Sequence, residues 1–472
     1  MNDVFLYESV AKSLEASITE GVFKVGDRLP SIRQICQKYA VNASTAVRAY
    51  VELEQQDLVE PRERSGYFVK PKPLINNILP IINKQDLKVY EVDVVQILKK
   101  LNQAKIDKNI VSLTSSVPDG HLIPQKKITR IIRQITAQEL EKSLMYDSMA
   151  GLLELRQEIA KFYTHANTPV SVDDIMITNG CLEAINLCLR ATVQQGDTIA
   201  VTLPCYFGIL RALQAFGLKV VEIPRNLSGF DIPQLERLIL EKNIKAILCL
   251  ANFNNPDGLS ISDENKKAMA LLSAKLKVPI IEDDIYTDLH FSERRPLSIK
   301  AFDKAGWVML CSSFSKIIAP GLRVGWVMGG RFHNKLENLK FTGNYSVPIF
   351  NQLIIKYLMH NNGLERHLKT MRKTLIKQYH LYRNCIEKSF PKGTPMSDPQ
   401  GGFVLWLELP KTIEVLKLYN KALECGVAFS IGQLYSPSKA YENFIRLSFS
   451  KAWNLETENA VKKLGQLVKE MM

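Results

Sequence analysis

The chain has 472 residues, more than one hydrophobic core usually supports, so two or three domains are expected. Its apolar and charged fractions, 46% and 23%, exclude a fibrous or disordered protein. Eight cysteines without any Cys-x-x-Cys spacing argue against a zinc site or a disulfide framework, and for a reducing compartment.

The net charge of +13 does not by itself indicate nucleic-acid binding. Residues 1–73 hold ten basic and ten acidic side chains, so the positive excess lies in the rest of the chain. The chain start has neither the basic nor the apolar part of a signal peptide, and no apolar run reaches the length of a membrane span. We therefore expect a cytoplasmic protein with no membrane contact and no metal.

The first seventy residues predict a small DNA-binding module. An apolar residue recurs every four positions over residues 6–18, a second short helix is predicted over 31–38, and a third from 43 to about 55. Asn42 is a plausible N-cap for the third helix. Two short strands around a charged turn follow over 58–69. Three helices and a hairpin predict a winged helix-turn-helix, whose third helix would enter the major groove.

This stretch resembles the GntR family of bacterial regulators. The match is carried by Gly26 to Arg33, Val41 to Thr45, Ala49-Tyr50 and Arg64 to Val69. The resemblance implies an operator in double-stranded DNA, contacted by Ser31, Arg33, Ser44, Thr45, Arg48, Arg64 and Gly66. The family usually has Ser-Arg where this chain has Asn42-Ala43, which removes one charged contact and puts affinity or site preference in question. A winged helix used only for protein contacts is the alternative.

Residues 74–108 are predicted to be a linker between the module of residues 1–73 and a domain of residues 109–472. Prolines interrupt the linker, but its isoleucines and leucines would be costly to leave in water. We therefore expect part of it to dock on a folded surface. The apolar spacing predicts a helix from Tyr90 to Asn102 that belongs to the next domain.

From about Ile110 onward, helical patterns alternate with short β-branched runs, which predicts an α/β fold with an open, mainly parallel sheet and helices on both faces. Ligands of such sheets bind at the carboxyl ends of the strands. The predicted strands are Ile175 to Thr178, Thr198 to Val201, Lys219 to Ile223, Ala246 to Cys249, Val278 to Glu282 and Val308 to Cys311.

The last of these strands leads to Lys316, which is preceded by small hydroxyl residues and followed by a Pro-Gly turn and an arginine. Lys316 could form an imine with pyridoxal phosphate, while Ser313, Ser315 and Arg323 could bind its phosphate. A solvated lysine in a polar loop is the simpler reading of this string alone. Asn179-Gly180-Cys181, at the start of a predicted helix, offers further amide donors for a phosphate.

Nearly everything from residue 109 to the end resembles fold-type I aminotransferases, with a large part over about 109–330 and a smaller α/β subdomain over about 360–472. The resemblance implies that Lys316 holds pyridoxal 5′-phosphate and that Asp283 keeps the pyridine nitrogen protonated. By the same resemblance, Tyr206 stacks on the ring and Asn255 and Tyr286 bind its hydroxyl. The implied phosphate ligands are Gly180, Cys181, Ser313, Ser315 and Arg323.

The resemblance also implies a homodimer and an amino acid site. Tyr146 matches a tyrosine that the neighbouring subunit contributes to the cofactor, and Arg446 matches the arginine that binds an amino acid carboxylate. Asp257 departs from the family, which often has threonine there; because Asn255 and Pro256 are kept, we expect no effect on cofactor binding. Taken singly, Asp283 could be a surface acid, Tyr206 a loop anchor and Arg446 a salt-bridge partner.

A GntR-type winged helix joined to an aminotransferase-like domain resembles the MocR family of bacterial transcriptional regulators. This resemblance covers the whole chain and implies a cytoplasmic dimer that binds DNA and senses pyridoxal phosphate, an amino compound, or both, through exchange at Lys316. Two alternatives stay open. One is a working transaminase that carries a DNA module, and the other is a repressor whose cofactor site has decayed.

Overall fold

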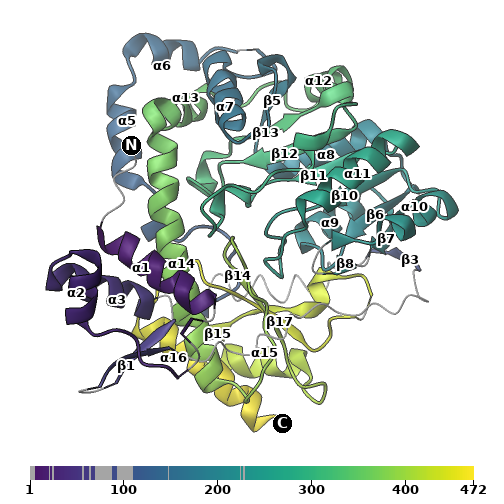
Figure 1. Cartoon of the computed structure of the whole chain (residues 1–472). Coiled ribbons are helices and arrows are strands. Elements are labelled where there is room, and N and C mark those ends of the chain that lie inside the picture. Colours follow the sequence, from purple (N-terminus) through teal and green to yellow (C-terminus); the bar gives the residue numbers. More distant parts are fainter. Residues whose placement is uncertain are drawn as a thin grey trace.

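The computed structural model of the chain describes residues 6–20, 22–23, 26–55, 58–62, 65–69, 88–92, 110–146, 148–223, 225–226, 229–438 and 440–472. Figure 1 shows the N-terminal helices as a small unit beside a larger body. Within the described residues, no helix is long and apolar enough to cross a membrane.

The N-terminal unit confirms the predicted winged helix. Its elements are α1 (Leu6–Thr19), α2 (Ile32–Tyr39), α3 (Ala43–Gln55), β1 (Val59–Arg62) and β2 (Gly66–Val69). The two strands form an antiparallel hairpin in which Val59 pairs with Val69. Ala46, Ala49, Tyr50 and Leu53 line one face of α3, and all are fully buried against α1 and α2. Asn42 caps α3 as predicted, because its side chain accepts the Thr45 amide at 2.8 Å.

The predicted helix from Tyr90 is wrong at its start. Val89–Glu91 form β3, which pairs antiparallel with β7 (Lys219–Ile223), the strand that would otherwise be the edge of the large sheet. Unpaired backbone groups of an edge strand attract another strand, and this tertiary pairing overrides the local helical spacing. The pairing is a docking of the connecting segment, as predicted for part of it. The remainder of the predicted helix lies outside the described residues.

The large sheet has eight strands in the order β3-β7-β6-β10-β11-β12-β13-β5. The central strands from β7 to β12 run parallel, whereas β3, β13 and β5 are joined by antiparallel pairings. The sheet is therefore mixed, with the mainly parallel centre that was predicted. Its other strands are β5 (Ile175–Thr178), β6 (Thr198–Thr202), β10 (Ala246–Cys249), β11 (Ile280–Asp283), β12 (Val308–Ser313) and β13 (Gly325–Met328).

Both faces of this sheet are covered, because alternate strand residues belong to two separate cores. Ile199 and Val201 face one core and Ala200 between them faces the other, which is the period of two of a strand. Helices α8 (Cys181–Thr192) and α9 (Phe207–Ala215) contribute to the first core. Helices α10 (Ile232–Glu241) and α11 (Asp263–Leu276) contribute to the second (Figure 1).

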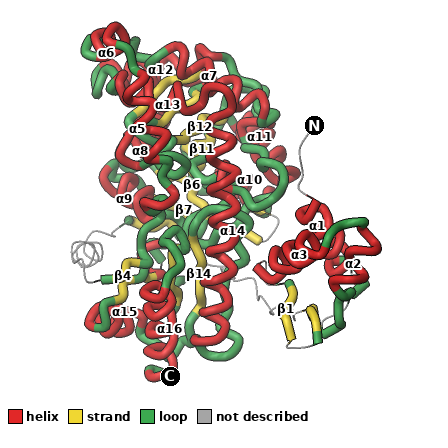
Figure 2. Tube along the Cα trace, turned by 90° about the vertical axis from the view of Figure 1, so that its left-hand side faces the viewer, coloured by secondary structure: helices red, strands yellow, loops and turns green. Residues whose placement is uncertain are grey.

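The C-terminal part has its own antiparallel sheet in the order β14-β17-β16, beside the long helix α14 (Figure 2). A short strand from the start of this domain, β4 (Val111–Ser112), runs parallel to β15 (Val427–Ala428). Residues near 112 are thereby held against the C-terminal part. Its elements are α14 (Gly363–Ser389), β14 (Val404–Glu408), α15 (Val415–Glu424), β16 (Ser430–Ile431), β17 (Phe444–Ser448) and α16 (Leu455–Glu470).

Further helices and short strands complete the domain. They are α5 (Gln125–Gln134), α6 (Ala137–Ser143), α7 (Leu153–His165), α12 (His333–Phe341), α13 (Ile349–Met359), β8 (Arg225–Asn226) and β9 (Gly229–Phe230).

Two ion pairs join the winged helix to the body. Glu8 binds Lys373 of α14 at 2.7 Å, and Lys12, one turn further along α1, binds Glu293 in the loop before Pro296. On α1 an acid is followed by a base, and each faces the opposite charge on the body. The two surfaces are therefore complementary in charge where they meet.

Candidate cofactor site and DNA-binding surface

Lys316 lies in the turn that follows β12, and its Nζ donates to the Ser116 carbonyl at 2.7 Å. The ammonium group also lies 5.8 Å from the centre of the Tyr286 ring. Burial lowers the pKa of Lys316, since a charged amine is poorly solvated there. A lysine with a depressed pKa reaches its neutral, nucleophilic form more readily, which is what attack on an aldehyde requires.

Asp283 is the last residue of β11 and is buried, with 6% of its surface exposed. Its Oδ1 accepts hydrogen bonds from the Cys181 thiol and the Ile285 amide, both at 3.2 Å. Burial raises the pKa of Asp283 to about 6, although both hydrogen bonds oppose the shift. A buried carboxylate with two weak donors suits a cationic partner such as a protonated pyridine nitrogen.

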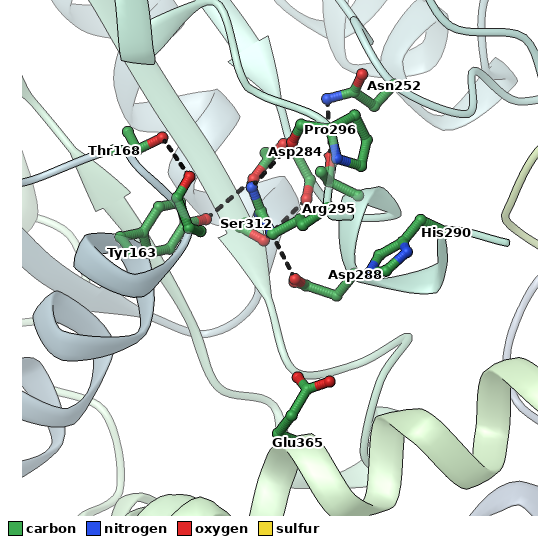
Figure 3. A network of polar contacts seen from close by, with 12 residues as sticks. Tyr163, Thr168, Asn252, Asp284, Asp288, His290, Arg295, Pro296, Ser312 and Glu365 are labelled. Carbon is green, nitrogen blue, oxygen red and sulfur yellow. Dashed lines mark hydrogen bonds and ion pairs between the residues drawn. The ribbon is translucent and has the colours of Figure 1, made fainter. Parts of the chain in front are cut away.

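The neighbouring Asp284 anchors this part of the sheet in a charged network (Figure 3). Arg295 reaches Asp284 and Asp288 at 2.7 Å each, and Tyr163 of α7 donates to Asp284 at 3.0 Å. All four side chains are buried or nearly so. Asp284 is thus neutralised by Arg295, whereas Asp283 forms no ion pair with any described residue. Of the two neighbouring acids, Asp284 is therefore structural, and Asp283 remains the candidate cofactor residue.

The residues predicted to bind phosphate surround Arg323. Its Nη1 lies 3.3 Å from Ser315 Oγ, and its Nη2 donates to the Asn179 carbonyl at 2.6 Å. Gly180 opens α8 at φ +95°, and a Cβ there would lie 2.6 Å from Arg323 Nη2. Glycine is therefore required at this position both by the positive φ and by the close guanidinium. Hydroxyls, a guanidinium and a helix N-terminus together fit a phosphate.

Arg446 projects from β17 and is fully buried. Its hydrogen-bond acceptors are all uncharged, namely Asn255 Oδ1 at 3.1 Å, Ser430 Oγ at 3.0 Å, Ser116 Oγ at 3.4 Å and the Thr114 carbonyl. No described carboxylate lies within ion-pair distance, and the buried Nε has no acceptor. A buried cation without an anionic partner is costly, so the site favours an anionic ligand.

Asn255 and Tyr286 lie between Lys316 and Arg446. Asn255 Nδ2 is 3.4 Å from Tyr286 Oη, and burial raises the pKa of Tyr286 to about 12. Tyr206 N-caps α9 and is half-buried, in ring contact with Phe207. The structure thus brings Lys316, Asp283, Asn255 and Tyr286 together, and these residues fit the ring substituents of pyridoxal 5′-phosphate. Ser313, also predicted, is buried and accepts the Ser315 amide at 3.3 Å.

Tyr146 behaves differently from the other predicted site residues. It is 85% exposed, and its ring packs edge-on against Tyr345 at 5.5 Å. Leu144 and Met145 beside it are also mostly exposed. Tyr146 forms no hydrogen bond with the described residues around Lys316 of its own chain, so its predicted role at the cofactor stays a prediction.

Asp257 has a structural role that explains its departure from threonine. Its carboxylate pairs with the buried Arg225 and accepts from Asn254 at 3.2 Å and from the Leu259 amide at 3.1 Å. Both partners of the ion pair are almost inaccessible to water. The acid therefore neutralises Arg225 and shapes the loop that carries Asn255.

The predicted DNA contacts come from the start of α2, from α3 and from the wing. Ser31 and Arg33 line a surface hollow of about 720 Å³ beside Arg28, which also lies 3.5 Å from a Cβ placed on Gly66 in the wing. Ser31 also caps α2, where its hydroxyl and the Gln34 side chain form a capping box. Arg28 was missed, although its position in the Asp27-Arg28-Leu29 turn before α2 is a recognisable signal.

On α3, Ser44 is exposed and binds the Asn42 side chain at 2.7 Å, while Thr45 is partly buried. Arg48 is exposed but lies over the Tyr7 ring of α1 at 4.2 Å. A guanidinium stacked on α1 is held near the helix surface rather than extended from it. Arg64 lies outside the described residues.

Ser116 is the main site residue that sequence reasoning missed. It contacts Lys316, Tyr286, Asn255 and Arg446, which come from four other parts of the chain. Its signal in the sequence is a hydroxyl-rich string, Thr114-Ser115-Ser116, directly after a short apolar run. That string resembles an ordinary loop until the tertiary contacts are known.

Comparison with known proteins assigns both parts of the chain. Residues 108–464 match the family of class I and II aminotransferases, and residues 6–69 match the bacterial regulatory proteins of the gntR family. The uncharacterized HTH-type transcriptional regulator YjiR of Escherichia coli is 34% identical over 99% of both chains. The HTH-type transcriptional regulator NorG of Staphylococcus aureus is 27% identical over 94% of this chain and 100% of its own.

Among solved structures, the kynurenine aminotransferase of Pyrococcus horikoshii is similar, with a TM-score of 0.75 and 27% identity over 80% of this chain and 95% of its own. The aminotransferase class I and II assignment implies pyridoxal 5′-phosphate as the cofactor, and the residues around Lys316 fit it. The gntR module, the aminotransferase domain and the full-length similarity to regulators together place this chain in the MocR-type GntR family of HTH-type transcriptional regulators.

Proposed function

We propose that this chain is a transcriptional regulator that binds an operator through its winged helix and senses an amino acid at a pyridoxal 5′-phosphate site. Arg446 carries this proposal. It is a buried guanidinium with only neutral acceptors, and it shares Asn255 and Ser116 with the Lys316 site. A carboxylate beside Arg446 would place an attached amino group near Lys316, where the cofactor supplies an electrophilic aldehyde.

Each residue of the site would have a distinct role. Lys316 would hold the cofactor and be displaced when an incoming amine takes its place. Asp283 would keep a proton on the ring nitrogen, Asn255 and Tyr286 would orient the ring hydroxyl, and Arg323 with Ser315 would hold the phosphate. Tyr206 would cover the ring.

Regulation further requires that the ligand prefers one arrangement of the two parts of the protein. The ion pairs of α1 with α14 and with the loop at Glu293 offer such an arrangement. That loop also carries Arg295, which is anchored to Asp284 next to the site. Release of the Lys316 amine would change the charge balance at Asp283, one residue from this anchor.

We further propose a homodimer formed through the aminotransferase domain. The exposed Leu144, Met145 and Tyr146 support it, because a contiguous apolar surface of this kind favours a partner. The dimer would bring Tyr146 of one subunit to the cofactor site of the other and would present two winged helices to a two-part operator.

The decisive experiment has two readouts. Borohydride reduction of the protein loaded with pyridoxal phosphate, followed by peptide mass analysis, should place the adduct on Lys316. The Lys316→Ala variant should give no adduct in this peptide. Footprinting upstream of the protein's own gene, with and without the cofactor and a panel of amino acids, should show protection that one amino acid alters. An adduct elsewhere, or a footprint unaffected by every amino acid and by Lys316→Ala, would refute the proposal.

A working transaminase is the second candidate, and the completeness of the site favours keeping it. Lys316, Asp283 and Arg446 are all in place, so nothing in the residues prevents amino-group transfer. Steady transfer to a keto acid at roughly 1 s⁻¹ or faster, without site-specific DNA binding, would favour this function over regulation.

A further inference from the structure

Ser116 occupies the middle of the proposed ligand site. It lies in the loop after β4, is 9% exposed, and uses its carbonyl and its hydroxyl in different directions. The carbonyl accepts from Lys316 Nζ at 2.7 Å and from Tyr286 Oη at 3.5 Å. The hydroxyl oxygen lies 3.4 Å from both Asn255 Nδ2 and Arg446 Nη1.

The hydrogen of this hydroxyl group is unused. Asn255 Nδ2 and Arg446 Nη1 are both donors, so Ser116 Oγ must act as the acceptor in both contacts. The orientation of the Asn255 amide is fixed independently, because its Oδ1 accepts from Arg446 at 3.1 Å. No described residue accepts the Ser116 hydroxyl hydrogen, so it is available to a ligand.

We propose that Ser116 is a specificity-determining residue that donates its hydroxyl hydrogen to the carboxylate of the ligand, alongside Arg446. This inference rests on the proposed function of the site and narrows the class of ligand. Two donors then converge on one anion: the Arg446 guanidinium and the Ser116 hydroxyl, while the Asn255 amide donates to Ser116 Oγ and Tyr286 Oη. A carboxylate has enough lone pairs for both donors, whereas an amine without a carboxylate offers Arg446 no anionic partner.

The same residue favours ligands whose amine and carboxylate lie close together, such as α-amino acids. The carbonyl of Ser116 marks where the Lys316 amine lies, and its hydroxyl marks where the carboxylate would bind. Both groups belong to one residue, so the amine and carboxylate positions are close together. In an α-amino acid a single carbon separates these groups, while an ω-amino acid places them several bonds apart.

The test uses the full-length protein loaded with pyridoxal phosphate. Binding is followed through the cofactor absorbance during titration with L-alanine, L-leucine and L-phenylalanine, and with the amines that lack their carboxylate: ethylamine, 3-methylbutylamine and 2-phenylethylamine. Loss of a hydrogen bond to a charged group should weaken amino acid binding by roughly tenfold or more in Ser116→Ala. Binding of the three amines should stay unchanged.

Ser430→Ala provides the matched control, because Ser430 Oγ is also a hydroxyl acceptor of Arg446, at 3.0 Å. A role of Ser116 that consists only of orienting Arg446 predicts equal losses in the two variants, and this result would overturn the proposal. Direct donation predicts a larger loss in Ser116→Ala.

Two other outcomes would also reject the inference: equal weakening of amino acids and amines, or a wild-type protein that binds each amine as tightly as its amino acid. The cofactor absorbance before titration separates this failure from the broader one. If the wild-type protein takes up no cofactor, the proposed function fails; if it does and Ser116→Ala has no selective effect, only the role of Ser116 fails.

Discussion

The thiol of Cys181, at the first position of α8, donates to Oδ1 of Asp283 at the end of β11 across 3.2 Å. This contact links the helix proposed to offer amides to the phosphate with the acid proposed to face the ring nitrogen. Burial raises the pKa of Asp283 and the Cys181 hydrogen bond lowers it, so the thiol favours the ionised acid.

Removal of this donor should weaken cofactor binding. In Cys181→Ala the pKa of Asp283 should rise further, so less of the acid is ionised at neutral pH and the affinity for pyridoxal phosphate should fall about three- to tenfold. Cys181→Ser keeps a hydroxyl donor and should bind nearly as the wild type does. Fluorescence titration with the cofactor from pH 6 to pH 8 measures this, and equal affinities for the Ala and Ser variants would count against it.

Asp283 should also make the cofactor-free protein less stable at higher pH. Its pKa is about 6 in the folded state, against 3.8 for an unperturbed aspartate, so the folded state binds the proton more tightly. Stability from this group is complete below about pH 3.8 and is lost as the pH rises through about 6. The loss is on the order of 3 kcal/mol, an upper figure for one group.

Asp283→Asn cannot ionise and should escape this loss. Without cofactor, the variant should melt at a higher temperature than the wild type at pH 7.5, and the difference should shrink as the pH falls from 6 toward 4. With cofactor present, the order at pH 7.5 should reverse, because the asparagine cannot stabilise a protonated ring nitrogen. Calorimetric melts of both proteins at pH 7.5 and near pH 4, each with and without cofactor, test this. A difference in melting temperature that does not depend on pH would exclude an ionisation effect.

Asp257 and Arg225 should depend on each other for stability. Asp257→Thr supplies the residue expected from other aminotransferases but leaves Arg225 buried without its acid, so it should destabilise the domain by about 3 kcal/mol or more. Arg225→Leu combined with Asp257→Thr removes the uncompensated charge and should recover much of this loss. Melting temperatures of the single and double variants decide; additive losses would mean that the ion pair is unimportant.

The sequence predicts an element correctly where the element's own residues determine it. It fails where a contact with a distant part of the chain determines the structure. Ile175 to Thr178 was predicted with its observed bounds, because a strand buried on both faces must be apolar along its whole length. Gly325–Met328 was missed as a strand, since the residues directly before it carry the Lys316 and Arg323 pattern. Tyr90 was placed in a helix because its pairing partner is over a hundred residues away.

The candidate site residues also divide into those that the sequence predicts and those that only tertiary contacts reveal. Lys316, Asp283 and Asn255 lie at or after strand ends, where the fold gathers ligand-binding groups, so their position was predictable from order along the chain. Ser116 follows a two-residue strand, and its partners come from four separate segments. Arg48 stays a predicted DNA contact, and its side chain lies over Tyr7, a contact that the helical pattern of α3 alone does not reveal.

On the DNA-binding surface, Arg33 and Ser31 should give different results. Arg33 is exposed and forms no salt bridge with the described residues, so Arg33→Ala should weaken binding at every sequence and reduce the salt slope of log K by about 1. Ser31→Ala also removes the cap of α2 and should destabilise the module by about 1 kcal/mol. Arg133→Ala, on the exposed face of α5, is the control. Titrations at several salt concentrations would contradict this if Arg33→Ala behaved like Arg133→Ala.

The contact between α1 and the body should respond to charge reversal. Glu8 and Lys373 are 2.7 Å apart, and Lys12 pairs with Glu293 one turn along the same helix. Exposed ion pairs contribute only about 0–1 kcal/mol each, so the docked arrangement is stabilised by a small margin that one substitution can remove. Lys373→Glu places two acids against each other and should release α1, which small-angle scattering would record as a larger radius of gyration at low salt.

The reciprocal change provides the control. Glu8→Lys combined with Lys373→Glu restores the opposite charges in exchanged positions and should return the compact form. High salt should make the wild type resemble the single variant, because screening acts on exposed charges. If the single variant, the double variant and the wild type scatter alike at low salt, these ion pairs do not hold the winged helix in place. The coupling between the cofactor site and the operator would then have to pass through the connecting segment, whose strand β3 is paired to β7.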